Sequence, residues 1–346
     1  MRRTRYGGYR GRRTGRDVLK YVILGLLVLI AVLAGILLLG REQPTAEEHP
    51  ETEQQEQISE DEQTETQPEV EPEPVPEPEP EPEPFVMQAV GVDLAQVLDG
   101  SWERMMKEAG ANTLILNMKP DDGTLNWDFG SSVEDSDINA KLWLMNSNAE
   151  YSVARISCFR DEALANTYEY CIRSNSGYRW KDFGGVHWVS PAHVEVQDRL
   201  IEQVVDLARL GFTEILLDNC GYPQNGSGEM GWIKRGEVYD LANLDAVIGD
   251  FLARLDEALE QEGWGPTISI RTNAVAVSDP AAARTGLTGA VLERYADRIW
   301  MSEIDTTLPL AEILTTVGVN NVEERLVTQT TTLVPENEWE QAVMPF

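Results

Sequence analysis

From residue 85 onward, short apolar runs alternate with stretches of helical periodicity, and this alternation constrains the fold more than any other feature of the chain. Buried parallel strands read as short apolar runs, and joining two of them requires a crossover, usually a helix. The apolar runs predict seven strands, at residues 86–92, 113–118, 151–159, 215–217, 267–271, 298–303 and 325–329. The periodic stretches predict helices at residues 101–109, 137–149 and 239–262, and one that opens at Ser190-Pro191 and stops at Gly211.

Seven such units in about 260 residues fit a (β/α)8 TIM-like barrel better than an open Rossmann sheet. No G-x-G-x-x-G follows the first predicted strand and no P-loop occurs, so nucleotide binding has no support. Only residues 336–346 remain for an eighth unit, with residues 342–346 as a stub of strand. We therefore expect a barrel whose eighth unit is incomplete or irregularly closed.

The first 84 residues have the composition of an anchor and a tether. Residues 1–20 contain eight basic residues and one acid and predict a basic cytoplasmic tail. Residues 22–40 are an uncharged apolar run, long enough for a transmembrane helix, assigned to residues 21–40. Residues 41–84 carry one basic residue and seventeen acids, become a Glu-Pro repeat, and predict a disordered, extended acidic linker.

This charge order predicts the orientation of the chain in a membrane. The positive-inside rule places the N-terminus in the cytoplasm and residues 85–346 outside the cell, so the expected location is the cell membrane, with a single pass. A cleaved signal peptide is the competing reading, but the apolar run is long and no clear small-x-small cleavage site follows it.

Composition excludes several classes of partner and cofactor. The net charge is −31, of which residues outside the first two charged segments carry −22, so nucleic acid is not an expected partner. Cys158, Cys171 and Cys220 are too few for a disulfide framework, and the three histidines form no metal-ligand spacing. We expect neither a metal nor a cofactor.

The fourth predicted strand ends in a carboxylate. Ile215, Leu216 and Leu217 are followed by Asp218-Asn219 and then by a loop rich in Gly, Asn and Ser. In α/β barrels, residues where a strand runs out form the active site. Asp218 is therefore the first candidate catalytic residue, although it could instead only anchor the turn.

The same segments resemble the family of bacterial TIM-barrel proteins catalogued as a "putative glycoside hydrolase" domain of unknown function. The matching motifs are Asn-Met-Lys-Pro-Asp-Asp-Gly at residues 117–123, Ala-Arg-Ile at 154–156, Phe-Arg-Asp at 159–161, Trp-Val-Ser-Pro at 188–191 and Leu-Asp-Asn-Cys-Gly-Tyr-Pro at 217–223. The resemblance implies a TIM barrel that acts on glycans.

Two segments depart from the family pattern. The sixth predicted strand ends in Met-Ser-Glu-Ile-Asp at residues 301–305, where the family has a Met-Tyr-Pro-Ser-like run. Asn219 and Cys220 replace aromatic and arginine residues of the fourth-strand motif.

Glycoside hydrolysis requires two carboxyl groups, one of them a proton donor and the other a nucleophile or base. Asp218 should lie at the rim, since Glu214, Leu216 and Asp218 share one face of an alternating strand. Glu303, at the end of the sixth predicted strand, is the first choice for general acid, because a neighbouring apolar side chain could raise its pKa. Asp93, Asp121 and Asp122 are alternatives from the first two strand ends, with a plain turn as the other explanation for residues 121–123.

Basic and aromatic residues complete the predicted site. Lys119, Arg155 and Arg271 lie in or just after strands and need carboxylate partners if buried, and Arg155 could hold Asp218 ionised. An ion pair of purely structural role would explain them equally well. Four tryptophans fall in loops on the predicted catalytic side and favour a carbohydrate groove: Trp127, Trp180, Trp188 and Trp232. Asn219 and Tyr222 follow Asp218 and join the expected substrate-binding set.

Two hypotheses follow from these patterns. In the first, residues 85–346 form a membrane-tethered glycoside hydrolase that acts on a cell-wall or extracellular polysaccharide. In the second, the barrel has lost catalysis and serves as a glycan-binding or scaffold module at the cell surface, as the diverged sixth strand and short C-terminal segment suggest.

Overall fold

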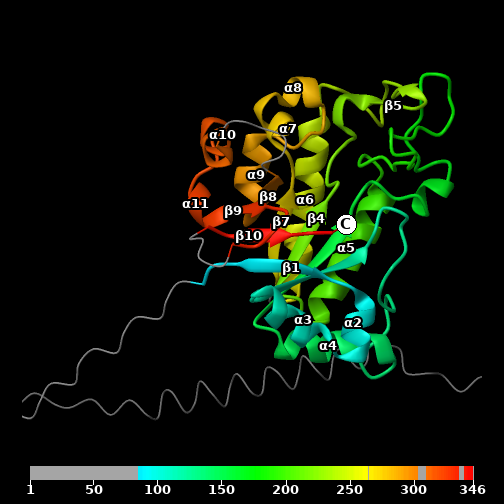
Figure 1. The fold of residues 1–346 in the computed structure, drawn as a ribbon. Helices are drawn as coiled ribbons and strands as arrows, with labels where there is room; N and C mark the ends of the chain where they lie inside the picture. The colour runs from blue at the N-terminus through cyan, green and yellow to red at the C-terminus, as the bar shows by residue number, and fades with distance from the viewer. Residues whose placement is uncertain (1–84, 264, 303–308, 335–338, 346) are drawn as a thin grey trace, which may run out of the picture. The chain divides into compact units, whose positions relative to one another are not determined.

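Eight parallel strands form the centre of the structure, a computed structural model that describes residues 85–263, 265–302, 309–334 and 339–345 (Figure 1). The strands are β1 (Gln88–Val92), β2 (Thr113–Lys119), β3 (Tyr151–Ser157), β4 (Glu214–Asp218), β7 (Thr267–Arg271), β8 (Arg298–Ser302), β9 (Leu326–Gln329) and β10 (Gln341–Val343). They close into a barrel in the order β1-β10-β9-β8-β7-β4-β3-β2. The predicted TIM-like barrel is confirmed.

The last strand is short, but the barrel is closed. Gln341 of β10 pairs with Gln88 of β1 on one side and with Thr328 of β9 on the other. The expectation of an irregular closure is therefore wrong for the sheet, because three residues are enough to bridge the two neighbouring strands. In the described residues the eighth unit consists of this strand alone, without a helix after it.

The predicted basic tail, transmembrane helix and acidic linker lie outside the described residues. In the part of the chain that the structure does describe, no helix is both long and apolar enough to cross a membrane.

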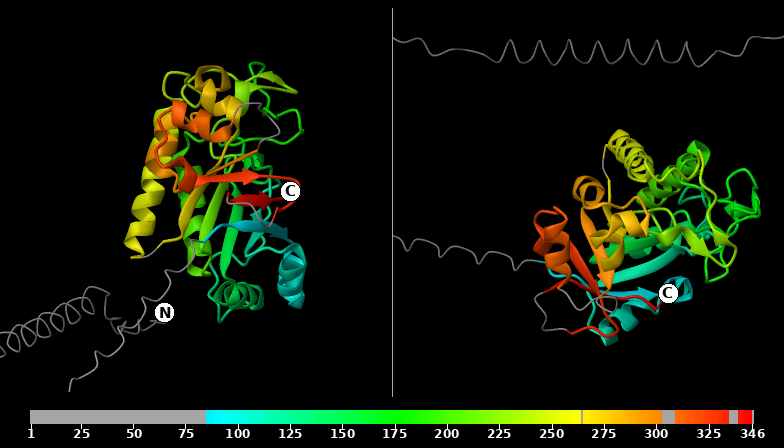
Figure 2. Two further views of the ribbon diagram at one scale, coloured as in Figure 1. Left: turned by 60° about the vertical axis from the view of Figure 1, so that its left-hand side comes forward. Right: turned by 90° about the horizontal axis from the view of Figure 1, so that it is seen from above.

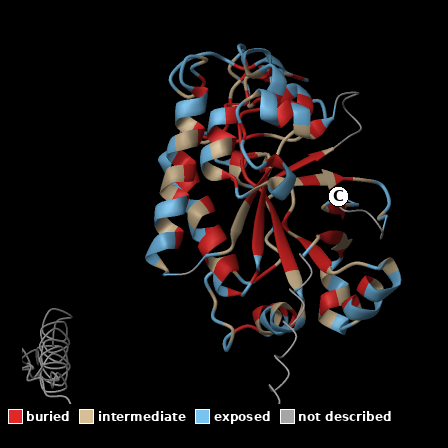
Figure 3. Cartoon of the chain, turned by 90° about the vertical axis from the view of Figure 1, so that its left-hand side faces the viewer, coloured by how far each residue is buried: buried red, intermediate tan, exposed pale blue. Residues whose placement is uncertain are grey.

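Helices pack around the strands, and the longer ones bury one face (Figure 3). The helices are α2 (Leu94–Asp99), α3 (Trp102–Ala109), α4 (Asp137–Asn148), α5 (Val194–Arg209), α6 (Leu244–Gln261), α7 (Ala274–Ser278), α8 (Pro280–Ala283), α9 (Gly289–Tyr295), α10 (Leu310–Thr316) and α11 (Val322–Arg325). The stripe of α5 includes Leu200, Val204 and Leu207, as its periodicity predicts.

Two helices begin later than predicted because polar side chains form turns before them. The Ser190 hydroxyl accepts from the Ala192 N–H at 3.2 Å, so Ser190 closes a turn and α5 begins at Val194. Asp240 accepts from the backbone N–H of Ala242 at 3.1 Å and from the Asn243 amide at 2.7 Å, and α6 begins only at Leu244. Both cases show the preference of Ser and Asp for turns over helix interiors.

Inward-facing side chains fill the barrel in layers. Apolar residues from seven of the strands and the segment before β1 form the middle: Met87, Ala89, Ile115, Val153, Leu216, Trp300, Val327 and Ala342. Below them, at the start of β4, lies the fully buried Glu214. It accepts hydrogen bonds from Trp300 Nε1 at 2.8 Å and Tyr151 Oη at 2.9 Å, and it forms an ion pair with Arg298 at 3.1 Å. The predicted alternation of Glu214, Leu216 and Asp218 on one face therefore holds.

The longest connections follow β3 and β4 and lie with α7 and α8 at the C-terminal end of the barrel strands (Figure 2). The connection after β4 contains a small hairpin of β5 (Ser227–Gly228) and β6 (Gly231–Trp232), and short 3-10 turns occur at Leu164–Asn166 and Gln224–Gly226. These loops build the walls of the site described next.

We expect Trp300→Ala to lower the free energy of unfolding by about 3–5 kcal/mol, because it opens a cavity in the barrel centre and removes a donor from Glu214. Trp143→Ala is the matched control, since Trp143 is 47% exposed and its loss should cost less than about 1 kcal/mol. Urea denaturation followed by circular dichroism measures both, and equal losses for the two variants would contradict this packing.

Candidate functional site

Asp218 ends β4 at the C-terminal rim of the barrel, opposite the end at which Glu214 lies. The next residue, Asn219, has a φ of 50°, a left-handed conformation that asparagine tolerates better than most residues. This turn brings the Asn219 N–H back to Asp218 Oδ1 at 2.8 Å. The strand end and the turn together fix the carboxylate at the opening.

Two guanidinium groups bind the other oxygen of Asp218. Arg155, from β3, contacts Oδ2 through Nε at 3.0 Å and Nη2 at 2.6 Å. Arg271, from β7, contacts the same oxygen through Nη1 at 2.9 Å. The predicted pairing of Arg155 with Asp218 is present, and Arg271 adds a second cation.

Burial alone would raise the pKa of Asp218, but the charges of Arg155 and Arg271 outweigh it and hold the pKa below its ordinary value. Asp218 is therefore ionised at neutral pH. Such a group is suited to act as a nucleophile or base and cannot serve as the proton donor.

The ion pairs continue from Arg155 as a chain of alternating charge through residues of the connections after β2 and β3. Arg155 Nη2 also contacts Asp121 Oδ1 at 3.0 Å, and Asp121 Oδ2 is bound by Arg160. Arg160 in turn forms an ion pair with Asp182 at 2.7 Å. Asp182 also accepts a hydrogen bond from Trp188 Nε1 at 3.0 Å.

Asp121 is unsuited to be the second catalytic carboxylate. Its Oδ1 and Asp218 Oδ2 share one nitrogen at 3.0 and 2.6 Å, so the two oxygens lie within 5.6 Å of each other. Both oxygens contact Arg155 Nη2, so a cation joins the two carboxylates, whereas a catalytic pair needs room for the sugar between its members. Asp121 is a positioning residue for Arg155.

A cavity of about 310 Å³ opens beside Asp218. Its lining comes from the ends of β4, β7, β8 and β9 and the loops after them, including Asp218, Asn219, Tyr222, Arg271, Thr272, Asn273, Ser302 and Gln329, together with Trp188 from the β3 connection. Five residues of the predicted set thus line one cavity: Asp218, Asn219, Tyr222, Arg271 and Trp188. Glu303 lies outside the described residues, directly after Ser302.

Several predicted substrate-binding residues lie elsewhere. Asp93 is exposed at the N-cap of α2, and Asp122 is exposed and accepts from the Thr124 N–H at 2.8 Å, which makes it a turn residue. Lys119 is buried and paired with Asp161 at 2.7 Å. None of these three lines the cavity.

The four tryptophans do not form one aromatic groove. Trp127 is buried and donates to Asp206 of α5 at 2.8 Å, and Trp180 is buried and donates to the Gly231 carbonyl at 2.8 Å. Trp232 is 53% exposed on the hairpin and outside the cavity lining. Of the four, only Trp188 lines the cavity.

Sequence reasoning missed Gln329, Thr272 and Asn273. Gln329 ends a predicted strand as Asp218 does, and the same rule that selected Asp218 would have found it. Thr272 and Asn273 directly follow β7, beyond Arg271. Within the described residues, Gln329 Nε2 and Thr272 Oγ1 are buried without a hydrogen-bond partner.

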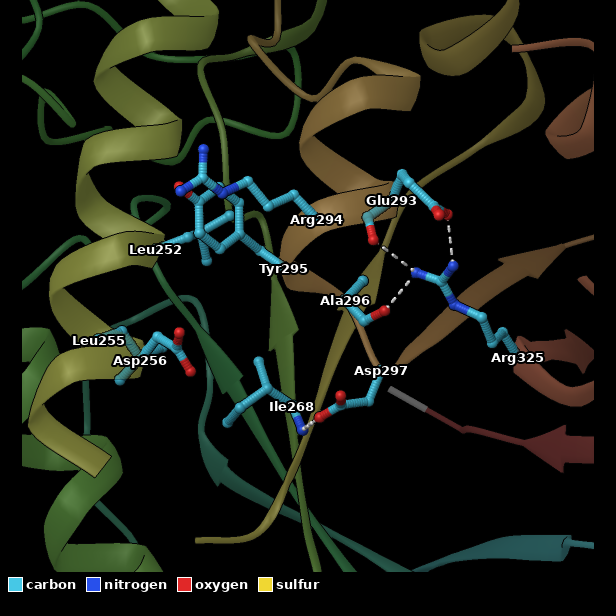
Figure 4. Close-up of a pocket in the computed structure, with 10 residues that line it drawn as sticks. All are labelled: Leu252, Leu255, Asp256, Ile268, Glu293, Arg294, Tyr295, Ala296, Asp297 and Arg325. Atoms are coloured by element: carbon cyan, nitrogen blue, oxygen red, sulfur yellow. Dashed lines mark hydrogen bonds and ion pairs between the residues drawn. The ribbon is translucent and has the colours of Figure 1, made fainter. Parts of the chain in front are cut away.

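A second cavity, of about 340 Å³, lies between α6 and α9 near the N-terminal end of β7 (Figure 4). The Asn320 N–H and side chain, together with Arg325, lower the pKa of Glu293 to about 2. Asp297 accepts from the Ile268 N–H at 2.7 Å. Glu293 and Asp297 thus hold α9 and β7 in place. The cavity does not lie at the C-terminal rim of the barrel, where the active sites of TIM barrels form.

Thiol and metal chemistry have little foundation here. Cys158, Cys171 and Cys220 are buried free thiols. The described residues contain no group of three or more His, Cys, Asp or Glu side chains that could hold a metal ion. The expected absence of a cofactor stays a prediction.

A parallel barrel with an ionised carboxylate and a cavity at the C-terminal rim is the arrangement of TIM-barrel enzymes. Residues 94–299, more than half of the chain, match the family described as "Putative glycosyl hydrolase domain", and the chain belongs to this family. The resemblance inferred from the motifs is confirmed.

Solved structures similar to the chain include a hypothetical protein from Ruminiclostridium thermocellum, with 19% identity over 52% of this chain and 96% of that one and a TM-score of 0.42. Ega3 of Aspergillus fumigatus, in complex with galactosamine, has 10% identity over 63% of this chain and 69% of its own, with a TM-score of 0.38. The glycoside hydrolase domain of PelA from Pseudomonas aeruginosa has 12% identity over 71% and 84%, with a TM-score of 0.40. No curated protein matches at a significant level.

We expect Asp218→Asn to lower the free energy of unfolding at pH 7 by about 3–5 kcal/mol, because it leaves Arg155 and Arg271 facing an uncharged partner. The folded-state pKa of Asp218 is lowered, so its contribution is fully present above its ordinary pKa, about 3.9, and is lost as pH falls through the lower value. The gap between wild type and variant should therefore narrow below about pH 4.

Denaturation of both proteins between pH 2 and pH 7 measures this gap. Asp250→Asn, at an exposed position on α6, is the control and should change stability by less than about 0.5 kcal/mol. If the difference in unfolding free energy between wild type and Asp218→Asn widens as the solution is acidified, the pKa of Asp218 is not lowered in the folded protein.

Proposed function

We propose that the chain is a membrane-anchored, extracellular glycoside hydrolase that acts on a cell-wall or extracellular polysaccharide with Asp218 and Glu303 as its two carboxyl groups. The observation that carries the proposal is the cavity at the C-terminal rim, lined by ionised Asp218 on one side and by the end of β8 on another. Membership of the glycosyl hydrolase family supports the same reaction class.

Asp218 takes the role of nucleophile or base. Its Oδ2 is occupied by Arg155 and Arg271, whereas Oδ1 accepts only the Asn219 N–H among the described residues. Oδ1 is therefore the oxygen available to attack a sugar carbon or to take a proton from water. The two guanidinium groups keep it ionised and fix its direction.

Glu303 takes the role of general acid. It directly follows Ser302, which lines the cavity at the end of β8, two strands from β4 in the barrel order. A proton donor together with an ionised carboxylate is the pair that glycosidic cleavage needs.

Trp188 and Tyr222 would supply apolar ring surface in the same cavity. Flat rings stack on the C–H faces of pyranoses, and a buried aromatic wall also excludes water from the reacting bond. These two residues, with Asn219, form the proposed binding surface for the sugar.

A non-catalytic glycan-binding module is the second candidate function. The observation that favours it is the three short guanidinium contacts to Asp218 Oδ2, which are also the pattern of a structural ion pair. Measurable turnover of any glycan would exclude this candidate.

For the first candidate, Asp218→Asn and Glu303→Gln should each lower kcat by at least about 10³-fold, because each removes one of the two groups that carry the reaction. The measurement is reducing-sugar release from a panel of cell-wall and extracellular glycans by the full chain. Glu312→Gln, at an exposed position in the first turn of α10, is the matched control and should leave kcat unchanged. Full activity of Asp218→Asn would show that the assignment is wrong.

The proposed anchor also gives a test of topology. We propose that residues 85–346 lie outside the cell, on a Glu-Pro linker that would extend about 3.1 Å per residue. Protease added to intact cells should release the barrel, and deletion of residues 21–40 should free it from the membrane fraction. A barrel protected until the cells are lysed would contradict this orientation.

A further inference from the structure

Two residues that line the rim cavity carry buried hydrogen-bonding atoms that the fold leaves without partners. Gln329, at the end of β9, is nine-tenths buried, and its Nε2 has no partner among the described residues. Thr272 Oγ1, after β7, is likewise buried without a partner. Both residues line the cavity, as does Arg271.

The direction of the Gln329 amide follows from its neighbour. Arg271 Nε donates to Gln329 Oε1 at 3.2 Å. A guanidinium has no acceptor, so the amide must turn its oxygen to Arg271 and its NH₂ away from it. Gln329 Nε2 is thus a fixed donor.

Arg271 itself retains donor capacity. Its bonds within the described residues are made by Nε and Nη1, and its side chain is 33% exposed. It is also the cation at one end of the alternating chain that runs through Asp218, Arg155, Asp121 and Arg160 to Asp182. The positive end of this chain therefore lies at the cavity.

This donor set matches a carboxylate better than a sugar hydroxyl. A hydroxyl accepts at most two hydrogen bonds and must also place its own proton, whereas a carboxylate has about four acceptor positions and no proton. Guanidinium and amide N–H groups next to a hydroxyl provide charge-assisted bonds to such an anion.

We propose that Arg271, Thr272 and Gln329 form a subsite for the carboxylate of an acidic sugar, so that the enzyme takes a uronic-acid-containing glycan. This inference rests on the proposed function, because it uses the same cavity. The subsite selects the substrate, and Asp218 and Glu303 act on it.

The test compares oligosaccharides of glucuronic or galacturonic acid with the same oligosaccharides after reduction of each carboxyl group to an alcohol. Calorimetry on the full chain in detergent measures both affinities. Wild type should bind at least one acidic oligosaccharide tenfold or more tightly than its reduced form. Arg271→Gln should bind the two forms equally. Gln329→Glu should bind the reduced form more tightly than the acidic one, because the new carboxylate repels the carboxylate of the sugar and pairs with Arg271.

Gln261→Glu, with the same charge change at the exposed end of α6, is the control and should leave the ratio intact. Circular dichroism establishes that each variant is folded. Equal or tighter binding of the reduced forms by wild type, binding of neither form, or a preference that survives both cavity variants would overturn the inference.

Hydrolysis assays with the same oligosaccharides and with neutral glycans separate this inference from the proposed function. Cleavage of neutral glycans without any preference for acidic ones removes the subsite and leaves the hydrolase. A preference for acidic sugars without cleavage of any glycan leaves the subsite and removes the hydrolase.

Discussion

The contact of Arg155 and Arg271 with one oxygen of Asp218 joins three adjacent strands, β3, β4 and β7, at the opening of the barrel. Two cations around one buried carboxylate keep it charged where burial alone would neutralise it. The same contact leaves Oδ1 as the less occupied oxygen and Arg271 at the cavity wall. The proposed chemistry and the proposed substrate preference both depend on this arrangement.

At its other end, strand β4 carries a second buried carboxyl group, whose pKa is shifted in the opposite direction. Glu214 is fully buried, and its burial raises the pKa despite the ion pair with Arg298 and the hydrogen bonds it accepts. Asp218, four residues later on the same face, has a lowered pKa because two guanidinium groups contact it. An apolar layer that includes Leu216 and Trp300 separates them. One strand thus holds a carboxyl group whose pKa is raised inside the barrel and another whose pKa is lowered at its mouth.

The barrel could be predicted from the sequence because its strands and helices have different hydrophobic periods, and because strand ends follow from where apolar runs stop. The alternation along β4 even placed Asp218 on the inner face. Loop contacts could not be predicted in the same way: whether Trp180 faces a sugar or the Gly231 carbonyl depends on how the connections after β3 and β4 fold over each other. The starts of α5 and α6 were displaced for a similar local reason, since Ser190 and Asp240 satisfy backbone N–H groups in turns.

An NMR titration of the Asp218 side-chain carboxyl carbon measures whether its two arginine neighbours keep this group ionised. We expect the Asp218 carbon to keep the chemical shift of a carboxylate as the pH falls through the ordinary pKa of an aspartate, about 3.9, and we expect Arg155→Gln to raise the pKa of Asp218. Protonation of Asp218 in the wild-type protein at or above that pH would show that the two arginines do not hold it ionised.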